Sequence, residues 1–321
     1  MLRKTVEAIV AEERAKQHNV VAERLEKALV NGNGHPSVPE RHQSDGLVRA
    51  KELIAEITPR RRLEDLVLPE VVRTAATQLV EEQQRASVLR SHSLEPRHRV
   101  LLVGPPGNGK TSLAEAMAES LALPLFIVRY EAMMGSFLGE TAARLKRVFD
   151  YIRTVPSVLF FDEFDAIGKE RGDRHETGEI KRVVTSLLMQ VDELPSYVVV
   201  IAATNHAELL DRAVWRRFQI RLSLPAPTQK QLSDFLTMLC ERANISLGMQ
   251  PQQILKNLKL TSYSEAEDFF LDVARRQVLA MGEQPKAEIT REQLRIWSLR
   301  VQSSVAKEGK PSARKTATKA S

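Results

Sequence analysis

The residues with the clearest chemical meaning form the glycine-rich stretch GPPGNGKT, between an apolar run and an amphipathic segment. Glycines let backbone N–H groups turn inward around a phosphate, and the N-terminus of the following helix adds partial positive charge. In such a loop Lys110 reaches the β- and γ-phosphates, and the Thr111 hydroxyl binds Mg²⁺. A glycine turn without a ligand is the alternative. The predicted nucleotide ligands are Gly104, Pro105, Pro106, Gly107, Asn108, Gly109, Lys110, Thr111 and Ser112.

A second chemical signal is the stretch SVLFFDE, in which an apolar run ends in Asp162 and Glu163. A strand that ends this way places both carboxylates at the carboxyl edge of the sheet, beside the phosphate loop. We expect Asp162 to hold the magnesium ion through its water shell and Glu163 to orient and polarise the attacking water. An acidic pair after a strand can also mark a helix N-terminus. The phosphate loop favours the catalytic interpretation.

The elements that must position these residues are short apolar runs that start at Val100, Leu125, Val158, Val198 and Gln219. Most are separated from the next by a helix-length amphipathic stretch. Short apolar strands joined through helices are typical of parallel strands buried on both faces. The sequence therefore predicts an α/β fold, a doubly wound parallel five-stranded sheet of the P-loop NTPase type.

Around this sheet the pattern changes, and we expect helices on both sides of it. A helix over about 48–57 is stopped by Thr58-Pro59, since the residue before a proline disfavours the helical conformation. Later helices are predicted over about 230–243 and from capping boxes that begin at Ser264 and Thr290. The predicted parts are an N-terminal helical segment (1–30), a linker and helix (31–61), the α/β domain (62–225), a small helical domain (226–302) and a disordered basic tail (303–321).

Composition narrows the class of protein. The 321 residues are 43% hydrophobic and 27% charged, as in soluble globular chains. The single cysteine, Cys240, fits an inert buried position in a reducing cytoplasm. We expect no signal peptide, because the N-terminal stretch MLRKTVEAIVAEE has no apolar h-region, and no membrane anchor, because the longest apolar stretch, 197–203, is too short to span a bilayer. Residues 303–321 hold five basic residues and one acid, so the tail carries most of the formal net charge of +6. A solvated tail is favoured over contact with nucleic acid or an acidic partner.

Four motifs in this order, GPPGNGKT, VLFFDEFDAIG, VVVIAATN and LLDRAVWRRF, resemble those of the AAA ATPases, a family within the AAA+ group. The resemblance spans about 63–301, including the small helical domain behind the α/β domain. It implies ATP and Mg²⁺ as cofactors, hydrolysis of ATP, assembly into a homo-oligomeric ring such as a hexamer, and a protein substrate or partner.

Further site residues follow from this resemblance. Asn205 stands at the position of the family's sensor 1, which helps to position the hydrolytic water. Arg216 and Arg217 match its paired arginine fingers, which a neighbouring subunit supplies to neutralise charge on the γ-phosphate. A solvated or salt-bridged arginine pair is the alternative for these two residues.

The resemblance also bears on substrate. Phe137 and Leu138, followed by glycine, are similar to a first pore loop, which grips a polypeptide in the central channel of the ring. A Phe-Leu pair can equally belong to a core. The polar stretch 168–178 is either a second pore loop or a plain solvated loop.

The adenine side departs from the family pattern. Leu66 and Val67 stand where relatives contact adenine by backbone, but the relatives' glycine is missing. Glu265-Ala266 replaces the Gly-Ala that opens the sensor 2 helix, so only Ala266 matches. Asp192-Glu193 replaces the Asp-Gly that relatives carry after the helix that follows the acidic strand.

We interpret the sequence as an ATP-hydrolysing ring-forming protein that remodels or threads a protein substrate. A nucleotide-dependent regulator of a partner and a DNA-associated ATPase are the alternatives. The DNA-associated ATPase would need a basic groove that the charge distribution does not favour. The N-terminal helices resemble those of small bacterial AAA ATPases encoded beside subtilisin-like proteases, which makes such a protease a candidate partner.

Overall fold

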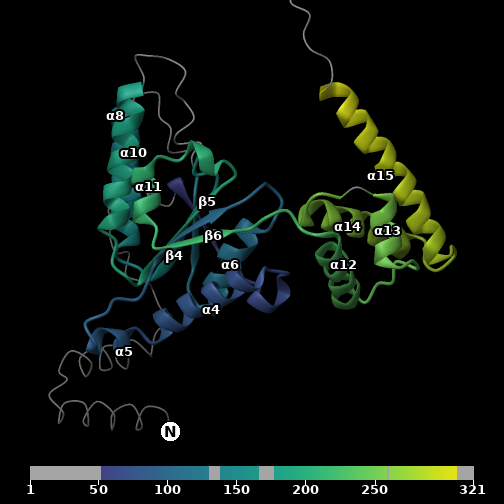
Figure 1. The fold of residues 1–321 in the computed structure, drawn as a ribbon, viewed down its shortest axis with the longest axis horizontal. Helices are drawn as coiled ribbons and strands as arrows, with labels where there is room; N and C mark the ends of the chain where they lie inside the picture. The colour runs from purple at the N-terminus through teal and green to yellow at the C-terminus, as the bar shows by residue number, and fades with distance from the viewer. Residues whose placement is uncertain (1–51, 130–137, 166–176, 259, 309–321) are drawn as a thin grey trace, which may run out of the picture. The chain divides into compact units, whose positions relative to one another are not determined.

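A computed structural model describes residues 52–129, 138–165, 177–258 and 260–308 of the chain (Figure 1). At 138–140, 177–183 and 300–308 it describes the backbone alone. The predicted N-terminal helical segment, 1–30, lies outside the described residues. None of the described helices is both long and apolar enough to cross a lipid bilayer.

Six strands form one sheet in the order β1-β3-β4-β5-β2-β6. The five strands β2 to β6 run parallel, as their short apolar runs predict. Strand β1 lies at the edge and pairs antiparallel with β3. The strands are β1 (Ile54–Ile57), β2 (Arg99–Val103), β3 (Leu125–Val128), β4 (Ser157–Phe161), β5 (Val198–Thr204) and β6 (Ile220–Ser223).

The prediction of a helix over 48–57 is wrong for residues 54–57, because Ile54–Ile57 is the edge strand β1, while residues 52 and 53 just before it are helical. Ile54 and Ile57 are three residues apart, a spacing that also fits one face of a helix. Four residues are too few to separate the two periods. The antiparallel partner β3, which lies far along the chain, decides the outcome.

Helices cover both faces of the sheet, which makes the domain doubly wound (Figure 1). On one face pack α8 (Leu138–Ile152), α10 (Thr177–Asp192) and α11 (Arg212–Arg217). On the other pack α4 (Glu70–Gln84) and α6 (Lys110–Ser120). Short elements complete the domain: η2 (Leu63–Asp65), α5 (Ala86–Ser91) and η3 (Ala207–Leu209).

The two central strands of the sheet are buried on both faces. Every residue of β4 and β5 is buried, so both faces of each strand contact apolar side chains. Phe161, which ends β4, stacks with Phe149 of α8 and meets the ring of Phe164 edge to face. Phe164 meets Phe218, just after α11, in the same way. This aromatic chain holds the backbone around Asp162 and Glu163 between two layers.

The C-terminal domain is helical, as predicted, and has its own apolar core. Two predicted helix starts are wrong. Helix α14 is capped by the Ser262 hydroxyl, which accepts from the Glu265 N–H, and Ser264 lies inside its first turn. Helix α15 begins before Thr290, whose buried hydroxyl donates to the Leu247 carbonyl at 2.6 Å. The helices are α12 (Gln229–Ala243), α13 (Pro251–Asn257), α14 (Tyr263–Leu279) and α15 (Lys286–Glu308).

Helix α15 also corrects the predicted boundary of the tail. Its backbone stays helical through Glu308, inside the segment 303–321 that was expected to be disordered. Residues 309–321 lie outside the described part of the chain.

Candidate functional site

Three neighbouring strands, β4, β5 and β2, bring the predicted chemical residues to one edge of the sheet. The acidic pair follows β4, Asn205 follows β5, and the glycine-rich loop follows β2. Because β5 lies between the other two strands, Asn205 stands between the acids and the loop. Ligands of open α/β sheets bind outside the carboxyl ends of such strands.

The glycine-rich loop has a shape that larger residues would disturb. A Cβ atom at Gly104 would lie 2.1 Å from the Leu224 carbonyl oxygen, where β6 passes beside the end of β2. Gly109 has a φ of 85°, in the left-handed region, and its conformation turns the chain into the first turn of α6. The loop thus delivers Lys110 and Thr111 at the positive end of a helix.

Lys110 is buried and its ammonium group meets three oxygen acceptors. Its Nζ donates to the carbonyls of Gly104 at 2.7 Å and Pro105 at 3.0 Å, and to Oδ1 of Asn205 at 2.6 Å. Burial lowers the pKa of the Lys110 ammonium, while the charges of Asp162 and Asp165 oppose that shift. The structure thus joins two predicted site residues, Lys110 and Asn205, by a direct contact.

The acidic pair after β4 divides into two environments. Asp162 accepts from the Thr111 hydroxyl at 3.1 Å and from the Glu163 N–H at 2.9 Å. Glu163 is exposed and has a φ of 46°, a left-handed conformation that is uncommon for a non-glycine residue. Asp162 is therefore tied to the phosphate loop, and the Glu163 carboxylate is presented to solvent.

Asp165 is a site residue that the sequence analysis missed. It is almost fully buried, and it accepts from the Thr204 hydroxyl at 2.9 Å and from the Asn205 N–H at 3.4 Å. A buried carboxylate with these partners fixes the end of β5 and the direction of Asn205. The signal was its place two residues after Glu163 in the acidic run DEFD.

The two predicted arginine fingers lie at the end of α11 in different surroundings. Arg217 pairs with Asp192 through Nε at 2.9 Å. Arg216 is exposed, and no described residue forms a hydrogen bond or an ion pair with it. Arg217 is thus salt-bridged and Arg216 is solvated, so the alternative of a solvated or salt-bridged pair stays open beside the arginine-finger interpretation.

The adenine-side residues are held by backbone and side-chain contacts. Arg73 donates to the carbonyls of Leu63 at 3.1 Å and Leu66 at 2.6 Å, and the Leu66 N–H donates to the Leu63 carbonyl. Both backbone groups of Leu66 are therefore engaged. Val67 makes no backbone hydrogen bond to any described residue. Ser112 accepts from Arg61 at 3.1 Å.

The first turn of α14 contacts the phosphate loop directly. The Ser264 N–H and hydroxyl donate to the Gly107 carbonyl at 3.1 and 3.3 Å. Ala266, predicted to contact adenine, is fully buried in the helical core. The Glu265 carboxylate, which replaces the family's glycine, accepts from the Thr261 N–H at 2.6 Å. The carboxylate thus forms a hydrogen bond with the backbone just before the start of α14.

The predicted substrate-gripping residues receive no structural description. Phe137 lies outside the described residues, and Leu138 opens α8 with only its backbone described. Of the stretch 168–178, only the backbone at Thr177 and Gly178 is described, as the start of α10.

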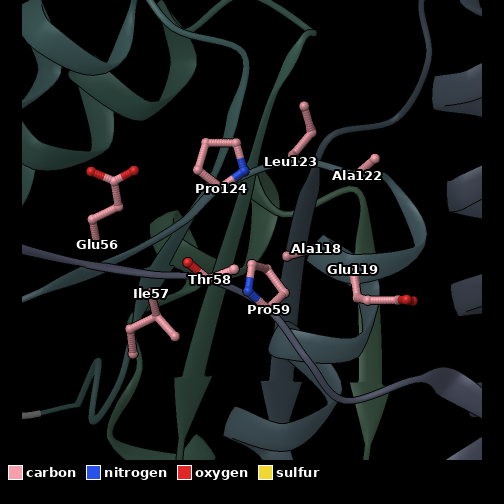
Figure 2. A pocket seen from close by; sticks show the side chains of 9 residues that line it. All are labelled: Glu56, Ile57, Thr58, Pro59, Ala118, Glu119, Ala122, Leu123 and Pro124. Atoms are coloured by element: carbon pink, nitrogen blue, oxygen red, sulfur yellow. The ribbon is translucent and has the colours of Figure 1, made fainter.

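A separate hollow of about 350 Å³ lies between the end of β1 and the C-terminal end of α6 (Figure 2). Ile57, Pro59 and Leu123 give it an apolar lining, and Glu56 and Glu119 add two carboxylates. Since Lys110 begins α6 and Glu119 lies at its other end, the helix separates this hollow from the phosphate loop by about 15 Å. None of the predicted nucleotide ligands lines it.

The fold and the site together define a nucleotide hydrolase of the P-loop type. Residues 100–226 match the family model described as "ATPase family associated with various cellular activities (AAA)". An uncharacterized AAA family ATPase, y4kL of Sinorhizobium fredii, is 36% identical over 274 residues, which are 83% of this chain and 81% of that protein. The chain therefore belongs to the AAA family of ATPases, and its activity is the hydrolysis of ATP.

Other relatives are larger proteins. A putative 26S proteasome regulatory subunit homolog of Methanothermobacter marburgensis is 32% identical, and the match spans 60% of this chain and 52% of that protein. The peroxisomal ATPase PEX6 of Kluyveromyces lactis is 34% identical over 57% of this chain and 19% of its own length. The chain thus matches about half of the archaeal relative and a fifth of the fungal one.

Proposed function

We propose that this chain is a ring-forming ATPase that uses ATP hydrolysis to remodel or thread a protein substrate. The observation that carries the proposal is the gathering of Lys110, Asn205, Asp162 and Glu163 at one sheet edge, while an exposed arginine on α11 has no use in that site. An exposed arginine without a polar partner among the described residues is suited to a neighbour's nucleotide, which supports assembly.

Each group at the sheet edge has a task in this proposal. Lys110 would bind the β- and γ-phosphates in place of its present carbonyl acceptors. Thr111 and Asp162 would hold Mg²⁺, because a hydroxyl and a carboxylate 3.1 Å apart are the oxygen ligands that this ion prefers. The ion would supply positive charge against the phosphates. Glu163 would accept a proton from the attacking water, which Asn205 helps to orient.

The substrate class is supported by the names of two relatives, a proteasome regulatory subunit homolog and a peroxisomal ATPase. In this chain Phe137 and Leu138 would contact the substrate polypeptide. An aromatic ring supplies apolar contact that tolerates many sequences. The single cysteine still favours a cytoplasmic location, and a subtilisin-like protease is one candidate partner.

The test measures ATP turnover and protein unfolding in one preparation of the full chain. The unfolding probe is a folded fluorescent protein with an unstructured peptide tail. We expect Phe137→Ala to lower the unfolding rate about tenfold more than it lowers the ATP turnover rate. Phe137→Tyr keeps the ring and should lower neither rate by much. Loss of fluorescence that persists in Phe137→Ala would contradict the gripping role. No ATP-dependent unfolding by wild type, with normal turnover, would favour the nucleotide-dependent regulator.

A further inference from the structure

The two arginines at the end of α11 are adjacent in sequence but differ in every contact. The side chain of Arg217 is 29% exposed, its Nε lies 2.9 Å from Oδ2 of Asp192, and its Nη1 donates to the Ala213 carbonyl at 2.9 Å. Arg216 is exposed, and within the described part of the chain its guanidinium has no hydrogen-bond or ion-pair partner. Arg217 is thus held by contacts within its own chain, whereas the exposed Arg216 side chain can contact another molecule.

Asp192 connects Arg217 to the rest of the domain. It is the last residue of α10, and its second oxygen, Oδ1, pairs with Arg99 at 2.5 Å. Arg99 is the first residue of β2 and its side chain is only 19% exposed. One carboxylate therefore ties together a strand and two helices. Asp192 itself is 39% exposed, but its two guanidinium partners are partly buried, which sets this cluster apart from a pair of fully exposed side chains, which contributes little.

Other contacts also anchor α11. Asp211 caps the helix by accepting from the Ala213 N–H, and Val214 is buried. The Trp215 carbonyl accepts from Arg221 at 2.6 Å, and the guanidinium of Arg221 lies 5.7 Å from the centre of the Trp215 ring. A helix of this length gains little stability from its own hydrogen bonds, so these anchors hold it in place.

If Arg217 served a neighbour, it would have to leave Asp192 and the Ala213 carbonyl. Asp192 would then keep a single cation, and α11 would lose its ion pair with α10. Arg216 can reach outward without breaking any contact with a described residue. The two arginines thus face different energetic costs for the same task.

We propose that Arg216 alone supplies the positive charge to a neighbouring subunit's nucleotide, and that Arg217 is a positioning residue which, with Asp192 and Arg99, holds α11 so that Arg216 points outward. This proposal rests on the proposed function, because it requires assembly. In the step concerned, the oxygen of water bonds to the γ-phosphorus while the bond from that phosphorus to the β–γ bridging oxygen breaks. ADP and phosphate leave, and the proton taken by Glu163 passes on to phosphate or solvent. Arg216 would stabilise the charge that builds on the transferring group.

The test compares single and double variants of the full chain at a concentration where the wild-type rate per subunit is constant. We expect Arg216→Ala to lower kcat by about a thousandfold. Arg217→Ala and Asp192→Asn should each lower it about tenfold, with little change in KM. The double variant Arg217→Ala/Asp192→Asn should be little worse than Asp192→Asn alone, because that change already weakens the contact that Arg217→Ala removes.

The direction in which Asp192→Asn changes kcat distinguishes the two possible roles of Arg217. If Arg217 acted on the neighbour itself, releasing it from Asp192 would leave kcat unchanged or raise it. If Arg217 is a positioning residue, the release lowers kcat. Arg99→Gln is a second variant that loosens Asp192, and it should reproduce the loss if Asp192→Asn does not fold. Arg212→Ala, an exposed arginine on the same helix, is the matched control and should stay within about twofold of wild type.

Two failures can be told apart. If the rate per subunit does not depend on concentration and Arg216→Ala keeps wild-type turnover, the proposed assembly-dependent function is wrong. If the rate depends on concentration but Arg217→Ala costs the larger factor and Asp192→Asn costs nothing, only the division of roles between the arginines is overturned.

Discussion

Lys110 carries the strongest argument at the scale of single residues. Its ammonium group donates hydrogen bonds to two loop carbonyls and to the Asn205 side chain, so its three N–H groups have acceptors before any phosphate binds. A buried cation without such acceptors would lose much of its hydration without compensation. Phosphate oxygens carry full negative charge and can replace neutral carbonyls as partners. The lysine is thus prepared for an anionic ligand.

We predict that binding and hydrolysis separate at this site. Lys110→Ala should weaken the binding of a fluorescent ATP analogue at least about tenfold, because a charge-assisted contact to phosphate is lost. Glu163→Gln should bind the analogue about as well as wild type and release phosphate about a hundredfold more slowly, because the general base is removed. Nucleotide titration and phosphate release measure the two effects.

An exposed carboxylate that is not among the predicted site residues provides the control for this prediction. Glu208, on η3, pairs only with His206 among the described residues, so Glu208→Gln should keep turnover within about twofold. Wild-type turnover in Glu163→Gln would remove Glu163 from the catalytic assignment.

Residue types and spacing predicted much of this site but not its connections. The loop, Asp162 and Asn205 each follow a strand, so their meeting at one sheet edge can be expected from topology alone. The contacts of Asp192 with Arg99 and Arg217 could not, because the three residues come from β2, α10 and α11. No local pattern marks such a carboxylate. It depends on how the helices pack.

At the scale of elements, long buried runs were predictable and short or capped ones were not. The buried strands β4 and β5 are uniformly apolar, which few other structures allow. Strand β1 has four residues, and its pairing with β3 outweighs its local pattern. Thr290 has the sequence of a helix cap, but its hydroxyl bonds the Leu247 carbonyl from inside α15. In both places, contacts with residues far along the chain determine the structure and outweigh the local sequence pattern.

The start of β2 provides a pH-dependent prediction. His98 is buried, its Nε2 has no hydrogen-bond partner among the described residues, and burial together with the charge of Arg99 lowers the pKa of its imidazole. Folding therefore favours the neutral ring. Its stabilising effect is complete above the ordinary value of 6.5 and is lost as the pH falls from there toward the lower folded value.

We expect the urea midpoint of wild type to fall between pH 7.5 and 5.5 by more than that of His98→Phe, which keeps an apolar ring and cannot be protonated. Urea unfolding at both pH values measures the difference. His92→Gln, at an exposed histidine, should retain the wild-type dependence. An equal fall in His98→Phe would show that other groups cause the acid sensitivity.

At the scale of the whole molecule, the nucleotide site is built from both the α/β and the helical domain. The Gly107 carbonyl accepts from Ser264 of α14, and Asp65 pairs with Arg242 of α12 at 2.7 Å. The segment that carries Leu66 is thus held from both domains, by Arg73 and by Arg242. Because Ser264 contacts the Gly107 carbonyl, we expect a nucleotide bound at this loop to affect the start of α14.

The exposed arginine leads to a prediction for the assembled molecule. If Arg216 completes the site of a neighbouring subunit, the ATPase rate per subunit should rise with protein concentration by about a thousandfold between monomer and assembly. Phosphate release over a dilution series, with sedimentation in ATP to give the mass of the particles, measures this dependence. The residual rate of Arg216→Ala should be flat over the same series.

Mixing Arg216→Ala with Glu163→Gln subunits should restore turnover, because some interfaces then combine an intact Glu163 with an intact Arg216. A rate that stays constant on dilution into monomers, together with no recovery on mixing, would show that each subunit hydrolyses ATP alone.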